Sequence, residues 1–217
     1  MSNLLLVTSP KYDDYTEYLS AYALLVIKET KNLGMDIRDL DEDRANKINF
    51  ESFAGKSNTK IIFLNGHGNE DSVCGHKDKI IVSNENVGLL KDKITYARAC
   101  SASTVLGKKA VENNKGSFIG YSRPFSFWIN GNWSAKPLND KGAGYCLYPS
   151  NEVVFFLMKG KTSAEAHQRS LRMMEENMKM LFRMNQRNEP GTIGILETLW
   201  NNYDGQVLLG NEEAKIG

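Results

Sequence analysis

Short apolar runs alternate with longer amphipathic stretches along the first half of the chain. The runs are rich in β-branched and aromatic residues and several end in glycine, serine or proline, which is typical of buried strands. They lie at residues 4–8, 35–37, 60–65, 80–82, 93–99 and 117–121. Apolar positions at helical spacing separate them at residues 14–33, 39–53 and 87–93, and again after residue 103. Strands that alternate with helices in this way predict a mainly parallel sheet.

The second half of the chain has a different pattern. Residues 122–150 contain glycine, asparagine, proline and aromatic side chains without a steady period, so we predict a long loop there. A long helix is expected from Thr162 or Ser163, where Glu165 supplies the third position of a capping box, to Met184. The remaining elements are a helix at 152–158, a helix at 192–202, a strand at 206–209 and a tail at 211–217.

The composition is that of an ordinary globular protein, with 41% hydrophobic and 24% charged residues. A chain of 217 residues can bury one core, and nothing divides it, so we expect a single domain over residues 1–217. The formal net charge of +1 gives no overall field that would attract nucleic acid or an anionic membrane, and neither is expected as a partner.

The cysteine count and the start of the chain predict the compartment. Cys74, Cys100 and Cys146 are too few for a disulfide framework and indicate a reducing environment. Residues 1–11 lack the basic start of a signal peptide, and no apolar run is long enough to span a bilayer. We therefore expect a cytoplasmic protein.

Two reactive side chains follow predicted strands directly. His67 comes after the strand at 60–65, and Cys100 comes after the strand at 93–99. Ligands bind beyond the carboxyl ends of parallel strands, and strands joined by one connecting unit are often neighbours. The imidazole and the thiol are therefore expected to face each other. A histidine or a cysteine alone is usually structural, but the pair matches the base and nucleophile of acyl transfer.

The neighbours of this pair fit the same chemistry. Gly68 leaves room for a bound carbonyl, and the backbone N–H groups of Gly68 and Cys100 are expected to form an oxyanion hole. A helix capped by Ser101 or Ser103 would place its amino terminus near the thiol and lower the thiol pKa. His67 is the second expected source of thiol activation.

Two segments of the sequence resemble a known family. IIFLNGHGNEDSVCG, followed by ITYARACSAS, resembles the His-Gly and Ala-Cys motifs of the caspase-like cysteine peptidases, which include caspases, legumain, clostripain, gingipain and separase. Residues 199–211 resemble the aromatic-rich last strand of the bacterial CHAT peptidases within that group. In element order the resemblance extends from the first strand to the last. It implies a three-layer α/β/α sandwich with about six strands.

By this resemblance the chain is a cysteine endopeptidase that uses no cofactor and acts on a protein or peptide. His67 carries over as the general base, Cys100 as the nucleophile, and Gly68 with the Cys100 backbone as the oxyanion donors. A separate activating protein is a further expected partner, because no sensor module is visible in the sequence. The CHAT resemblance also implies a role in bacterial stress or antiphage defence.

In this family the residue two positions before the nucleophile lines the pocket for the substrate side chain. That residue is Arg98, whose guanidinium fork matches a carboxylate, so cleavage after acidic residues is expected. The alternative is that Arg98 pairs with an internal acid such as Asp71. The loop at 122–150 lies where relatives carry substrate-binding loops, and Arg123 and Trp128 are expected to contact substrate.

Two other interpretations stay open. A soft tetrahedral zinc site is the first, although its ligands are irregularly spaced, at His67, Cys74, His76 and Cys100. The second is a catalytically silent module or zymogen, for which the methionine-rich helix at 171–184 would offer an adaptable partner face. The presence of both His67 and Cys100 favours the enzyme.

Overall fold

The computed structural model of the chain describes residues 2–31 and 33–216. Within these residues, six strands form a central sheet in the order β2-β1-β3-β6-β7-β8. The strands are β1 (Leu4–Ser9), β2 (Asp36–Asp41), β3 (Thr59–Asn65), β6 (Ile94–Arg98), β7 (Ser117–Tyr121) and β8 (Gln206–Gly210). Neighbouring strands run parallel, except that β8 runs antiparallel to β7 at one edge. The prediction of a mainly parallel sheet of about six strands is confirmed.

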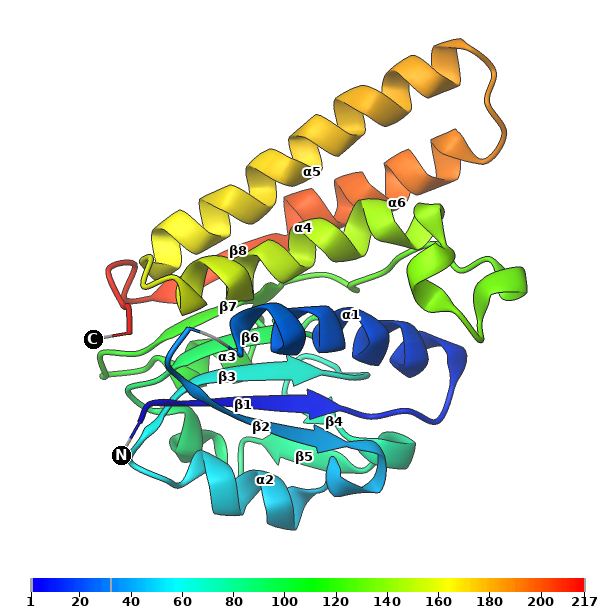
Figure 1. Cartoon of the computed structure of the whole chain (residues 1–217). Coiled ribbons are helices and arrows are strands. Elements are labelled where there is room, and N and C mark those ends of the chain that lie inside the picture. The colour runs from blue at the N-terminus through cyan, green and yellow to red at the C-terminus, as the bar shows by residue number, and fades with distance from the viewer. Residues whose placement is uncertain (1, 32, 217) are drawn as a thin grey trace.

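Helices cover both faces of the sheet, which gives three layers (Figure 1). On one side lie α1 (Asp14–Thr30), α4 (Lys141–Met158), α5 (Ser163–Gln186) and α6 (Thr192–Gly205), and on the other α2 (Lys47–Ala54) and α3 (Leu106–Ala110). Leu5 and Val7 of β1 pack into the first layer, whereas Leu6 packs into the second. Because both of their faces are buried, the inner strands β1, β3, β6 and β7 read as largely apolar runs. No helix in the described part of the chain is long and apolar enough to cross a membrane.

A small hairpin stands apart from the central sheet. It consists of β4 (Ser72–Cys74) and β5 (Ile80–Ser83), which pair antiparallel with Val73 opposite Val82. The strand predicted at residues 80–82 is therefore confirmed, as the second strand of this hairpin. Its position matters for the site because the loop that carries His67 leads directly into β4.

The loop predicted over 122–150 is wrong in its last part, where α4 already runs. Asp140 caps this helix by accepting hydrogen bonds from its first N–H groups. Pro149 lies inside the helix and cannot donate to the carbonyl of Tyr145 one turn earlier. The side chain of Asn177 in α5 donates to that carbonyl instead, at 2.9 Å. A tertiary contact thus supplies the hydrogen bond that Pro149 removes from this helix.

Three smaller predictions are corrected. Residues 39–41 extend β2, because they pair with β1, and do not begin a helix. Residues 87–90 form a short 3-10 helix, Val87–Leu90. The helix after Cys100 starts only at α3 and has no side-chain cap, so neither Ser101 nor Ser103 caps it. Ser101 has a φ of 53°, a left-handed conformation that interrupts a helix at this point.

The start of α5 and the end of the chain are held together. The predicted capping box is confirmed, because Thr162 Oγ1 accepts from the N–H of Glu165 and the Glu165 carboxylate accepts from the N–H of Thr162. Residues 211–216 are not a loose tail: the N–H of Ser163 donates to the carbonyl of Ala214 at 2.9 Å. Gly217 lies outside the described residues.

Candidate active site

The loops that carry the two predicted catalytic residues meet at one edge of the sheet. β3 and β6 are parallel neighbours, His67 follows β3 and Cys100 follows β6. This is the carboxyl edge, where open parallel sheets bind their ligands. Gly68 allows the loops to approach closely, because a Cβ atom there would lie only 2.9 Å from the Cβ of Ala99. Even an alanine at position 68 would force the two loops apart.

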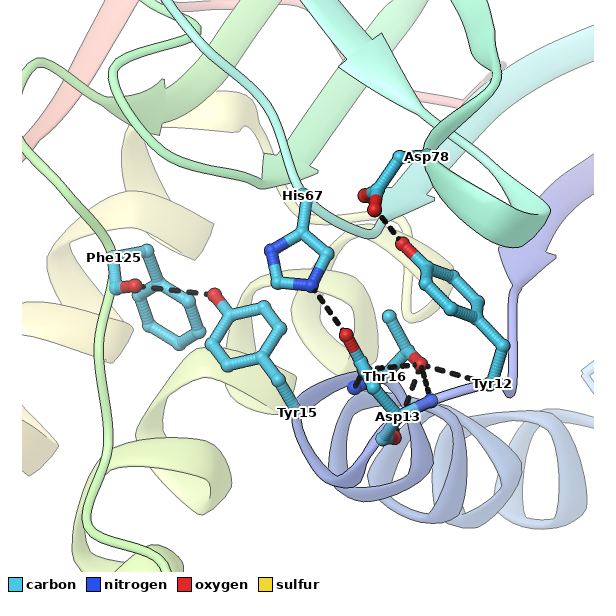
Figure 2. A network of polar contacts seen from close by, with 7 residues as sticks. All are labelled: Tyr12, Asp13, Tyr15, Thr16, His67, Asp78 and Phe125. Atoms are coloured by element: carbon cyan, nitrogen blue, oxygen red, sulfur yellow. Dashed lines mark hydrogen bonds and ion pairs between the residues drawn. The ribbon is translucent and has the colours of Figure 1, made fainter.

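A carboxylate that the sequence prediction missed holds the imidazole. Nε2 of His67 lies 2.8 Å from Oδ2 of Asp13 (Figure 2). Asp13 follows β1, which neighbours β3 in the sheet, and it caps α1 by accepting from the N–H of Thr16 at 2.8 Å. Burial opposes ionisation of Asp13, but hydrogen bonds from Thr16 and His67 hold the pKa of its carboxyl below the usual value. The signal in the sequence is an aspartate at the N-cap of α1, four residues after the end of β1.

Aromatic rings surround the imidazole. Tyr15 stacks on His67 with ring centroids 4.8 Å apart, and Tyr12 approaches it edge-on at 6.2 Å. The hydroxyl of Tyr12 donates to Asp78 at 2.6 Å, which fastens the loop before α1 to the turn after β4 (Figure 2). The His67 side chain is still 36% exposed, so a substrate can reach the ring.

The thiol of Cys100 is in a resting arrangement. It donates to the carbonyl oxygen of Phe125 at a distance of 3.7 Å, and burial raises the pKa of the thiol above its usual value. Among the described residues, no hydrogen bond joins Cys100 to His67. The helix amino terminus expected beside the thiol is also missing, because α3 starts six residues later. The thiol is therefore protonated at neutral pH.

Two backbone N–H groups at this edge have no acceptor among the described residues. Gly68 lies opposite Val73 in an isolated antiparallel β-bridge. The hydrogen bonds of this bridge are made by the flanking residues; the N–H of Asn69, for example, donates to the carbonyl of Ser72 at 3.0 Å. Within residues 2–31 and 33–216, neither the N–H of Gly68 nor that of Cys100 donates to a protein acceptor. They are the groups predicted as the oxyanion donors.

The resting state of the thiol predicts how it reacts with a simple alkylating agent. We expect the rate of carboxamidomethylation of Cys100 by iodoacetamide to keep rising above pH ~8.5, the value at which an exposed cysteine is half ionised. Mass spectrometry of the Cys100 peptide at a series of pH values measures this. A midpoint below pH ~7 would contradict the prediction, because it would reveal a thiolate already paired with a protonated imidazole.

Comparison with known proteins identifies the fold. No protein-family model and no curated protein sequence matches the chain. The solved structure of the Arg-specific cysteine proteinase gingipain R is similar, with a TM-score of 0.58 and 11% sequence identity over 99% of this chain. The complex of the pro- and mature domains of Porphyromonas gingivalis RgpB is similar as well, with a TM-score of 0.58 and 10% identity over 97% of this chain. The fold is caspase-like.

The chain spans about half of these neighbours, since 47% of each of their chains is covered. At 10–11% identity the likeness establishes the fold and leaves activity and specificity to be argued from the residues. The caspase-like prediction is confirmed at the level of fold.

Arg98 does not line a substrate pocket as predicted. Its side chain is 0% exposed, and its nitrogens donate to Oδ1 of Asn65 at 2.7 Å, Oδ1 of Asn151 at 2.9 Å and the carbonyl of Leu19 at 2.8 Å. The guanidinium also lies 4.7 Å from the ring centroid of Phe63. Arg98 is thus a structural cation, out of reach of a substrate carboxylate.

The alternative prediction for Arg98, a pair with an internal acid, is corrected as well. Its hydrogen-bond partners are amide and carbonyl oxygens, and Asp71 is exposed on the loop after His67. Burial lowers the pKa of Arg98 to about 10, so the group stays charged at neutral pH without a carboxylate partner. Neutral oxygens and aromatic faces replace the ion pair that the sequence led us to expect.

The two remaining predicted substrate residues lie on the segment after β7. Arg123 forms an ion pair with Asp204 of α6 at 2.7 Å, and both side chains are more than 40% exposed. Trp128 is 46% exposed and its ring packs against Gly194. Both side chains are accessible, and contact with substrate stays a prediction for them.

The residues of the alternative zinc site are spread around the same edge. Within the described ranges, no three histidine, cysteine, aspartate or glutamate side chains are grouped as metal ligands. The ring of His76 packs edge-on against Tyr12 at 5.4 Å, and burial raises the pKa of Cys74, which favours its neutral thiol. These side chains line the hairpin next to the site.

Proposed function

We propose that the chain is a cysteine peptidase with His67 as the general base and Cys100 as the nucleophile. The observation that carries the proposal is the contact of the Asp13 carboxylate with Nε2 of His67. It lies at the edge of the sheet where β6 ends and the loop with Cys100 begins. A carboxylate in this place fixes the tautomer with the proton on Nε2 and leaves Nδ1 to accept a proton. A purely structural histidine would not need an exposed face at such an edge.

The proposed reaction proceeds through an acyl-enzyme. As the sulfur of Cys100 attacks the carbonyl carbon of a peptide bond, the thiol proton passes to Nδ1 of His67. The carboxylate of Asp13 stabilises the imidazolium, and the N–H groups of Gly68 and Cys100 bind the oxyanion. The imidazolium then protonates the leaving amine. Water attacks the thioester with His67 as the base again, which releases the acid and restores the thiol.

A latent form activated by a separate protein is the second candidate. It is supported by the hydrogen bond of the Cys100 thiol to Phe125, which the thiol must leave before it reacts. The segment around Phe125 is fastened to α6, since Asn202 exchanges two hydrogen bonds with Ser126 at 2.6 and 3.1 Å. A partner that moves α6 would release the thiol. One similar structure is a complex between a pro-domain and a mature domain, which supports a protein partner here.

The finer predictions concern substrate preference, relationship, biological role and location. Preference for acidic substrate side chains depended on Arg98 and, with that residue buried, is not part of the proposal. A CHAT-type relationship, a role in stress or antiphage defence and a cytoplasmic location depend on sequence resemblance or composition and stay predictions. The name of one similar structure, a cysteine proteinase, supports the reaction class.

An acyloxymethyl ketone probe for cysteine peptidases tests the proposal, with the modified residue identified by mass spectrometry. We expect an adduct on Cys100 in the wild type and its loss in His67→Ala, because alkylation requires the thiolate that His67 generates. His167→Ala is the matched control, since this histidine lies on α5 and contacts the carbonyl of Gln206. An adduct independent of His67, or equal labelling of Cys74, would refute the dyad. Absence of any adduct would favour the latent form.

A further inference from the structure

Tyr15 contacts both halves of the site. It lies in the first turn of α1, two residues after Asp13. Its ring stacks on the imidazole of His67 with the planes inclined by 21°, and its hydroxyl donates to the carbonyl of Phe125 at 3.1 Å (Figure 2). The same carbonyl oxygen accepts from the thiol of Cys100. One side chain therefore connects the base to the segment that holds the nucleophile.

The plane of the Tyr15 ring is fixed from the core. Phe127 stacks against it with centroids 4.9 Å apart and planes 18° apart. Tyr18 continues the series, 5.7 Å from Phe127 at 27°. Phe127 is buried and Tyr18 is completely so. Close-packed rings in a core cannot tilt freely. The stack therefore also restricts the tilt of its last ring, the imidazole of His67.

His67 is thus restrained in two directions. Asp13 contacts the edge of the imidazole at Nε2, and Tyr15 covers one of its faces. The hydrogen bond alone fixes the position of Nε2 but still lets the ring turn about that contact. Proton transfer requires Nδ1 to come within hydrogen-bond reach of the Cys100 thiol, and small displacements of reacting atoms are costly. The stacked face supplies the restraint that the carboxylate lacks.

The hydroxyl of Tyr15 acts on the other half of the site. Burial raises the pKa of Tyr15 well above its usual value, so the phenol keeps its proton and remains a donor throughout the neutral range. Its hydrogen bond holds the carbonyl of Phe125 in the place where the Cys100 thiol donates to it. The ring and the hydroxyl therefore have separate roles that substitutions can separate.

We propose that Tyr15 is a positioning residue of this site: its ring holds the plane of the His67 imidazole for proton transfer, and its hydroxyl holds the Phe125 carbonyl beside the Cys100 thiol. The inference rests on the proposed peptidase function. It assigns the restraint of the base to a residue that does not itself touch the substrate.

The test uses inactivation by the acyloxymethyl ketone probe as a function of probe concentration. Tyr15→Met fills the space without a planar face, and we expect its maximal inactivation rate constant to fall by about tenfold or more, with a half-saturating concentration within about threefold of wild type. Tyr15→Phe keeps the ring and should change this rate constant by no more than about threefold in either direction, because only one hydrogen bond, to the carbonyl that the thiol must leave, disappears. Tyr148→Met is the control, since Tyr148 packs on Tyr22 of α1 and is 43% exposed.

Proton NMR of the imidazole provides a readout that needs no turnover. The ring C–H signals of His67, assigned by their absence in His67→Ala, should be shifted upfield by the stacked ring in wild type and Tyr15→Phe. They should move downfield in Tyr15→Met and stay in place in Tyr148→Met. If Tyr15→Met does not fold, Tyr15→Phe still decides, because a tenfold loss in that variant would overturn the role given to the ring.

The remaining outcomes separate this inference from the proposed function. Equal maximal rates in Tyr15→Met and Tyr148→Met would overturn the positioning role, as would a change confined to the half-saturating concentration, which indicates a substrate contact. A wild-type protein that forms no Cys100 adduct would count against an active peptidase and favour the latent form, whereas His67 signals that are upfield in wild type and move downfield in Tyr15→Met would still support the restraint of the ring by Tyr15.

Discussion

Asp13→Asn is expected to lower the rate of Cys100 modification by the peptidase probe roughly 10- to 100-fold, the usual cost of removing a group that orients an active-site side chain. The amide keeps the shape of the carboxylate but loses the negative charge that stabilises the imidazolium of His67. Asparagine is as good an N-cap as aspartate, so α1 keeps its cap to Thr16. The variant therefore tests the negative charge of Asp13 separately from its role as the N-cap of α1.

The pH dependence of this effect follows from the pKa of Asp13, which is held below the usual carboxyl value. A carboxyl with a lowered pKa is ionised throughout the neutral range. It stops stabilising the imidazolium only as the pH falls through that lowered pKa. The ratio of wild-type to Asp13→Asn rates should therefore be constant between about pH 6 and 8 and shrink only in acid. Asp14→Asn is the matched control, because that exposed neighbour does not contact His67. Equal loss in both variants would reduce Asp13 to a helix cap.

The sequence predicted the positions of His67 and Cys100 but could not predict Asp13. The first two directly follow strands that are buried on both faces, and such strands are visible locally as apolar runs. The contact of Asp13 with His67 joins residues 54 apart and exists because β1 is the neighbour of β3. Strand order is a tertiary property, so an N-cap aspartate carries no local sign of its second partner.

The failures in the second half have the same origin. Gly142, Gly144 and Pro149 look like a loop because each is unfavourable in an isolated helix. In the structure, Gly144 lets Tyr148 pack closely, and Asn177 from α5 supplies the hydrogen bond that Pro149 cannot make. Local propensity is overridden wherever another helix supplies the missing contact, and which helix does so cannot be derived from the pattern.

Arg98 was misplaced for a related reason. The resemblance to the caspase-like peptidases implied a pocket role for the residue two positions before the nucleophile, and a charged group is rarely buried without a carboxylate. Its actual partners come from three elements: Leu19 in α1, Asn65 in β3 and Asn151 in α4. Only when the sheet and the helical layer are assembled do these neutral oxygens converge on one guanidinium.

Arg98→Met is accordingly expected to have the largest effect on stability, a loss of about 3–5 kcal/mol in the free energy of unfolding, because each buried oxygen left without its donor costs about 1–3 kcal/mol. Removal of the guanidinium leaves the oxygens of Asn65, Asn151 and Leu19 buried without donors. Chemical denaturation monitored by circular dichroism measures the change. Arg187→Met, which breaks an ion pair exposed to solvent on both sides, should leave the denaturation midpoint almost unchanged.

Arg98→Lys separates the charge of this group from its geometry. An ammonium keeps the positive charge but is a compact donor that cannot reach three acceptors in the plane of a fork, so we expect a loss smaller than that of Arg98→Met and still clear. A lysine variant as stable as wild type would show that charge alone matters. Because Asn65 ends β3 two residues before His67, and Leu19 lies in the helix that Asp13 caps, the network joins the two elements that bring base and carboxylate together. The buried cation thus acts on the site through the backbone that carries it.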